Sequence, residues 1–122
     1  MTREQCLSNI NSCTQALNEF RTKKAQYESL SGPLTEAIAS LAVAKGNIST
    51  AASQLGTYYT SKKATEKVGV LQEQCGKIST MISTIKSGIQ EAIEKVKKMN
   101  YKIEEMNSRI EQYNAILPTL KE

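Results

Sequence analysis

A heptad pattern of apolar residues between Ala64 and Leu120 constrains the fold more than any other feature of this sequence. Residues suited to burial recur there in alternating steps of four and three, so they share one face of a slightly supercoiled helix. With a rise of 1.5 Å per residue, this helix is about 80 Å long, and we expect a rod-like molecule. The pattern, called the seam below, consists of Ala64, Val68, Leu71, Cys75, Ile78, Ile82, Ile85, Ile89, Ala92, Val96, Met99, Ile103, Met106, Ile110, Tyr113, Leu117 and Leu120.

The N-terminal half carries a second, interrupted seam. Thr2 and Gln5 have the spacing of a capping box, which predicts a helix start. We expect the pattern that begins at Leu7 to slip at Ser31-Gly32-Pro33, because Pro breaks a helix interior but is accepted in the first turn of a new helix. We expect this segment to be a hinge whose only role is to realign the seam. The seam positions on either side are Ile10, Cys13, Leu17, Phe20, Lys24 and Tyr27, then Leu34, Ile38, Leu41, Lys45, Ile48, Ala52, Leu55 and Tyr59.

The segment from Leu55 to Ser61 predicts the turn that joins the two halves. Gly56 is predicted to end the first arm as a C-cap, and Thr60 or Ser61 to begin the second as an N-cap. Two long arms with one seam each should fold back on one another. We therefore predict an all-α fold, a long antiparallel helical hairpin that resembles a coiled coil. It forms a single domain over 1–122, with arm one at 2–57, a break or kink at Gly32-Pro33 near 31–33, a turn at 56–61 and arm two at 62–117.

Composition removes most catalytic chemistry. The chain has no His and no Trp, and its acidic residues are scattered, so no acid–base pair, nucleophile triad or phosphate loop is recognisable. Cys6 and Cys13 lie seven apart and Cys75 lies on the seam, which matches no zinc-ligand spacing. We expect buried, reduced thiols, and we predict no enzymatic activity, no metal and no cofactor.

Charge and hydropathy limit the classes of partner. The net charge is +4, with lysines mixed among acids, which does not favour nucleic acid. No apolar run is long enough to span a membrane, and the first residues lack the apolar core of a signal peptide. We expect a cytoplasmic protein at synthesis, and a non-Sec route if the chain is secreted.

A hairpin of two helices buries little surface, so the sequence predicts association. Three apolar residues beside the seam widen its apolar face: Met81, Ile93 and Ile116. Three small residues seven apart, Gly69, Gly76 and Ser83, form a row where another helix could approach closely. The alternative is that these glycines only weaken the helix. These six residues are our partner-binding candidates.

Tyr101 and Glu105 form a Tyr-x-x-x-Glu pair late in the second arm. With Val68 and Ile103 at heptad position a, Tyr101 falls at f and Glu105 at c, so both point away from the seam. Core packing, the usual role of a helical Tyr, fits Tyr113 but not Tyr101. Recognition by a partner and an incidental surface pair both remain open.

These features together resemble the small WXG-type helical proteins of Gram-positive type VII secretion, most closely the small partner proteins that accompany LXG-domain toxins. The shared features are the helical hairpin, the Gly in its central turn and the late Tyr-x-x-x-Glu; the chain lacks the Trp of the family's turn motif. The resemblance implies a non-catalytic targeting factor that pairs with the helical N-terminal domain of a larger effector, with or without a second small helical protein. It implies that Tyr101 and Glu105 are the export signal and that Leu55-Gly56-Thr57 is the turn motif.

Two other classes of protein fit the same pattern. A structural or scaffold coiled coil would self-associate into a symmetric homo-oligomer. A chaperone or needle-like hairpin of another secretion system would share the fold without using Tyr101.

Overall fold

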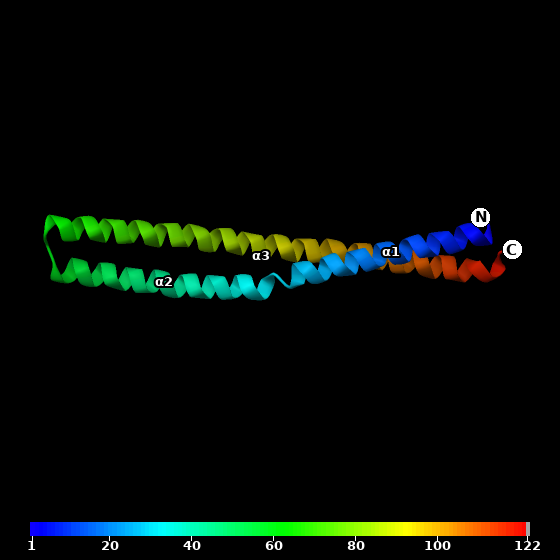
Figure 1. The fold of residues 1–122 in the computed structure, drawn as a ribbon, viewed down its shortest axis with the longest axis horizontal. Coiled ribbons are helices and arrows are strands. Elements are labelled where there is room, and N and C mark those ends of the chain that lie inside the picture. Colours follow the sequence, from blue (N-terminus) through cyan, green and yellow to red (C-terminus); the bar gives the residue numbers. More distant parts are fainter. Residues whose placement is uncertain (122) are drawn as a thin grey trace. The chain divides into compact units, whose positions relative to one another are not determined.

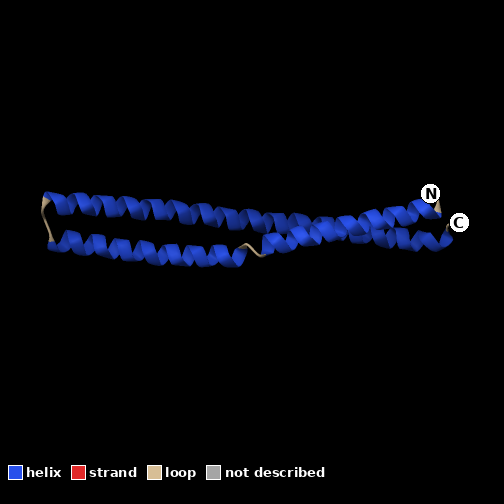
Figure 2. Ribbon diagram, viewed as in Figure 1, coloured by secondary structure: helices blue, strands red, loops and turns tan. Residues whose placement is uncertain are grey.

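The computed structural model describes residues 1–121 and shows an all-α, coiled-coil-like helical hairpin, as predicted (Figure 1). Helices and short connections make up this part of the chain, and no strand occurs among residues 1–121 (Figure 2). The elements are α1 (Arg3–Glu28), α2 (Ser31–Tyr58), α3 (Lys62–Ile116) and a 3-10 helix, η1 (Leu117–Thr119).

The structure divides into two compact units, which we call the terminal unit and the hairpin unit. The terminal unit combines Met1–Leu30 with the chain from Glu91 onward, and in it α1 packs against the C-terminal part of α3. The hairpin unit is Ser31–Gln90, and in it α2 lies beside the N-terminal part of α3. The single domain over 1–122 stays a prediction, and Glu122 lies outside the described residues.

The seam of the second arm is confirmed. Every seam position from Ala64 to Leu120 is buried or half-buried. The most deeply buried of them are Ala64, Ala92, Met99 and Met106. Heptad spacing predicts burial well here because in each unit a single helix, α1 or α2, covers the seam face of α3.

The core of the terminal unit is a cluster of Cys13, Leu17 and Met106, with Phe20 and Tyr113 among the side chains packed against it. Cys6 is fully buried, and its thiol donates to the Tyr113 carbonyl oxygen at 3.4 Å. The Lys102 ammonium lies 5.3 Å from the centroid of the Phe20 ring, and that of Lys95 lies 5.5 Å from the Tyr27 centroid. These two lysines therefore cover aromatic rings at the edge of the core while keeping their charges in water.

The start of the first seam was predicted one residue too late. Leu7 is 46% exposed, whereas Cys6 is buried. Cys6 and Cys13 are one heptad apart, so the small thiol takes the core position and the larger Leu7 lies beside it. At the other end, Tyr59 falls in the turn and is 62% exposed.

The predicted break in the first arm is present, but it lies at Ser29 and Leu30, just before Gly32 and Pro33. Pro33 lies in the first turn of α2. Its ring would clash with the carbonyl of the residue four positions earlier, Ser29, so the helix is interrupted upstream of the proline. The seam does not slip, because Tyr27 and Leu34 are one heptad apart and both are half-buried.

The turn between α2 and α3 is shorter than predicted. Gly56 does not act as a C-cap: α2 continues to Tyr58, and no glycine among the described residues has a positive φ. The predicted N-cap is Ser61, whose hydroxyl accepts from the Ala64 N–H at 3.2 Å. The capping box of Thr2 and Gln5 at the start of α1 is confirmed.

Candidate functional site

The predicted export signal lies on α3 in the terminal unit. Tyr101 is 75% exposed, and it lines a shallow hollow of about 270 Å³ with Lys97, Asn100 and Glu104. The Glu105 carboxylate accepts from Arg109 Nη2 at 2.6 Å, an ion pair between exposed side chains one helical turn apart. Both residues of the signal therefore point away from the core, as their heptad positions predict. Their role in export stays a prediction.

The residues assigned to the turn motif lie in the last two turns of α2. Leu55 is half-buried on the seam. The Thr57 hydroxyl donates to the Ser53 carbonyl oxygen at 2.7 Å, a bond within the helix. A Cβ added to Gly56 would lie 3.7 Å from Val68 Cγ2, an ordinary van der Waals contact. Leu55-Gly56-Thr57 is therefore helical, and the connection to α3 follows it.

The six partner-binding candidates are all exposed residues of α3. Their heptad positions place them on two sides of the seam. Gly69, Gly76 and Ser83 at b and Ile93 at e lie on one side, whereas Met81 and Ile116 at g lie on the other. The first three and Met81 belong to the hairpin unit, and the two isoleucines belong to the terminal unit.

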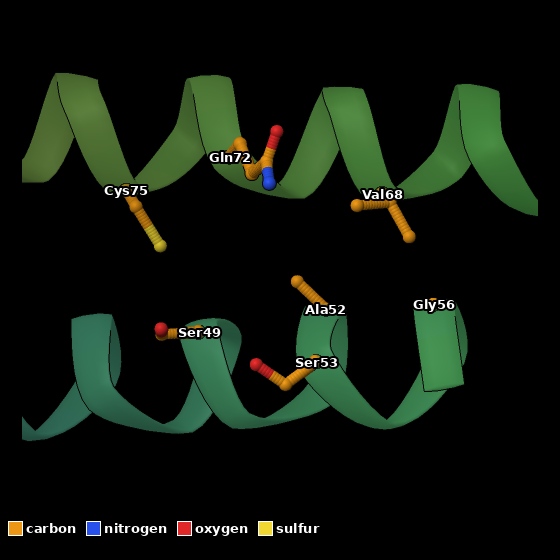
Figure 3. A pocket seen from close by; sticks show the side chains of 7 residues that line it. All are labelled: Ser49, Ala52, Ser53, Gly56, Val68, Gln72 and Cys75. Carbon is orange, nitrogen blue, oxygen red and sulfur yellow. The ribbon is translucent and has the colours of Figure 1, made fainter. Parts of the chain in front are cut away.

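A hollow between α2 and α3 in the hairpin unit was not predicted from the sequence. It has a volume of about 340 Å³. Figure 3 shows Ala52 pointing from α2 toward α3, and Val68 and Cys75 pointing from α3 toward α2. Its lining residues are Ser49, Ala52, Ser53, Gly56, Val68, Gln72 and Cys75.

The hollow exists because α2 contributes only small side chains at this level. Ala52 occupies a seam position where Leu or Ile would reach across to α3, and Gly56 has no side chain. The Cys75 thiol lies 3.7 Å from the Lys45 carbonyl oxygen, a weak contact that leaves the sulfur half-buried. The abundance of Ala and Ser in this segment was the available signal. The lining has hydroxyl, amide and thiol groups but no charge, so the hollow can receive an apolar or neutral side chain.

Charged groups lie at the surface of both units. The ion pairs of Lys24 with Glu28 at 3.8 Å and of Lys97 with Glu94 at 3.6 Å join exposed or half-exposed side chains within one helix. Such pairs contribute little to stability.

Within residues 1–121, no group of three or more His, Cys, Asp or Glu is placed to hold a metal ion. None of the described helices combines the length and the apolar character that a membrane crossing requires. The chain matches no family model, and comparisons with curated proteins and with solved structures also found no match.

Proposed function

We propose that this chain is a non-enzymatic helical partner protein that binds a helical segment of another protein side by side. One observation carries the proposal: among the second-arm seam positions, only Ala64, Ala92, Met99 and Met106 are buried, and all the others are half-buried. One packed helix therefore covers the apolar face of α3 only in part. A helix whose apolar face stays partly uncovered can pack against a further helix, as in a helical bundle.

The energetics of a helix pair support the same proposal. Each helix can bury only the side chains that face its partner, and the buried residues include small ones such as Ala52, Ala64 and Ala92. Burial contributes about 25 cal/mol per Å² of apolar surface, while ordering the backbone costs about 1 to 2 kcal/mol per residue. A further helix packed against the half-buried seam side chains would add apolar burial while ordering little more of this chain.

The more specific proposal is a targeting role in type VII secretion. In it, the chain pairs with the helical N-terminal domain of a larger LXG-type effector, and Tyr101 with Glu105 forms the export signal of the complex. Its support is the sequence resemblance together with the 75% exposure of Tyr101, which leaves the phenol available to a receptor. No packing role within the chain accounts for this Tyr.

Affinity purification of the tagged chain from its own host tests the proposal. The co-purifying proteins are identified by mass spectrometry, and the complex is sized by light scattering. We expect a much larger protein with a long helical N-terminal region, in fixed stoichiometry. Recovery of this chain alone as a symmetric oligomer would contradict the proposal and favour the structural coiled coil.

Replacement of Tyr101 tests the export signal separately. Tyr101→Ala removes an exposed side chain, so helicity and stability should stay within about 0.5 kcal/mol of the parent, while export of the complex is lost. Tyr58→Ala is the matched control, because Tyr58 is 77% exposed at the end of α2. Export that is unchanged in Tyr101→Ala rejects the signal and leaves the partner proposal standing.

A further inference from the structure

We infer that one side of the hairpin unit is the docking site for a single helix of the partner, and that this helix carries a bulky aliphatic side chain between two acidic ends. The inference rests on the proposed function and adds to it the position of the site and the chemistry of the partner. The site, called the hairpin groove, runs between α2 and α3 over the hollow of Figure 3.

The walls of the hairpin groove are small and uncharged. On α2 they are formed by the outward residues Ala42, Gly46, Ser49, Ser53 and Gly56, all exposed. On α3 the corresponding exposed or half-buried residues are Gly69, Gln72, Gly76, Ser79 and Ser83. Solvated helix faces normally carry charges at such positions. Small residues instead allow a third helix to approach at the short end of the usual 8–10 Å interaxial range.

The hollow determines which side chain the partner helix should carry at its middle. Its floor is formed by Ala52, Val68 and Cys75, which are buried or half-buried. At about 340 Å³, it has room for one large side chain. An aliphatic group would contact the floor without leaving a polar atom unpaired, whereas a charged group would find no opposite charge among the lining residues.

Two lysines beside the hairpin groove determine which residues the partner helix should carry at its two ends. Lys62 and Lys86 are exposed and lie at positions b and e of α3, on the groove side. At 1.5 Å per residue they are about 36 Å apart. Between them no b or e position of α3 carries a charged residue. The charged residues of this stretch lie at positions c, f and g, namely Lys63, Glu66, Lys67, Glu73 and Lys77. A helix that spans the groove therefore gains from an acidic residue near each lysine.

Like charges oppose one arrangement of a second copy of this chain as the occupant. If two grooves faced one another with their α3 helices antiparallel and in contact, Lys62 would lie opposite Lys86 of the other copy. The occupant that we propose is a different protein, because its helix can place acidic residues at Lys62 and Lys86.

Synthetic peptides test the site on the full-length protein. The probe is a fluorescein-labelled peptide of about 24 residues, the length of α3 between the lysines, with a leucine stripe at helical spacing and Glu at both ends. The comparison peptide has Lys in place of Glu. We expect the Glu peptide to bind about tenfold more tightly in anisotropy titrations, with a difference that shrinks as salt is added. Equal affinities, or no binding of either peptide, would overturn the inference.

A pair of substitutions locates the binding surface. Gly76→Lys places a long charged side chain in the groove, where no atom lies within 4 Å of the added Cβ. Gln74→Lys adds the same charge at position g, on the other side of the seam, where the parent residue is also exposed. Lys favours helix more than Gly does, so the first variant should fold. We expect Gly76→Lys to weaken binding of the Glu peptide at least tenfold and Gln74→Lys to change it by less than about threefold, because an exposed charge off the interface contributes little.

The remaining outcomes separate this inference from the proposed function. If Gly76→Lys still captures the effector as the parent chain does, the groove is not the site, although the partner role stands. If the parent forms a dimer in light scattering that Gly76→Lys dissociates, a second copy occupies the groove and the inference is wrong. If purification from the host yields this chain alone, the proposed function fails whatever the peptides do.

Discussion

Gly56 lies inside a helix in the structure, whereas its sequence context predicts a helix end. The sequence suggests a helix C-cap, whereas the structure places Gly56 inside α2 with a helical backbone. Gly56→Ala should then stabilise the protein by about 1 kcal/mol, because Ala is the better helix former. The new methyl group also makes an ordinary contact with Val68 Cγ2. Urea unfolding followed by circular dichroism measures the change.

Gly46→Ala is the matched control for that prediction. Gly46 lies in the same helix, and no atom lies within 4 Å of an added Cβ there. It should show the same gain in helix propensity without the contact to Val68. A destabilised Gly56→Ala beside a stabilised Gly46→Ala would mean that α2 ends at Gly56 in a left-handed cap.

Met106 and Met81 differ in burial, so their replacement tests which side chains form the core. Met106 is 8% exposed and belongs to the terminal core, whereas Met81 is 49% exposed. Met106→Ala should cost about 2 kcal/mol, the low end for such substitutions because a helix pair can partly close the cavity. Met81→Ala should change stability by less than about 0.5 kcal/mol. Similar losses for the two variants in urea unfolding would contradict the assigned burial.

Pro33 explains why the first arm is broken into α1 and α2. Pro33→Ala restores an N–H that can donate to the Ser29 carbonyl and removes the ring that clashes with it. A helix continuous through Ser29 and Leu30 then becomes accessible. In that helix the Ser31 and Gly32 N–H groups would donate to the Tyr27 and Glu28 carbonyl oxygens. Since Pro costs about 3 kcal/mol in a helix interior, amide exchange at Ser31 and Gly32 should slow by up to about 100-fold in NMR experiments. Unchanged exchange would show that Ser29 and Leu30 break the helix without the proline.

The helices follow from the sequence because each depends on local signals that the sequence contains. Heptad spacing placed the α3 seam, and the capping residues Thr2 and Ser61 placed two helix starts. Leu7 was predicted instead of Cys6 because Leu is the larger apolar residue, although the spacing from Cys13, one heptad later, indicates Cys6. Likewise, the proline suggested a slipped seam, although Tyr27 and Leu34 are one heptad apart.

The hollow could not be predicted because it depends on two helices at once. Ala52 and Gly56 are ordinary helix residues when α2 is considered alone. Only the register between α2 and α3 places them opposite Val68 and Cys75, where their small size leaves space. A sequence pattern specifies which residues face a partner, but not how well the facing volumes match.

At the scale of the whole molecule, the proposals differ in how stability depends on concentration. A folded monomer that awaits another protein should melt at the same temperature at every concentration of the chain. A coiled-coil dimer that unfolds as it dissociates should instead gain about 2.7 kcal/mol per dimer when its concentration rises 100-fold, which raises Tm by about 5 °C for two chains of this size. We expect the Tm to stay constant in scanning calorimetry of the chain alone and to rise when the purified effector domain is added. A concentration-dependent Tm would favour the structural coiled coil, because only association between identical chains links the two quantities.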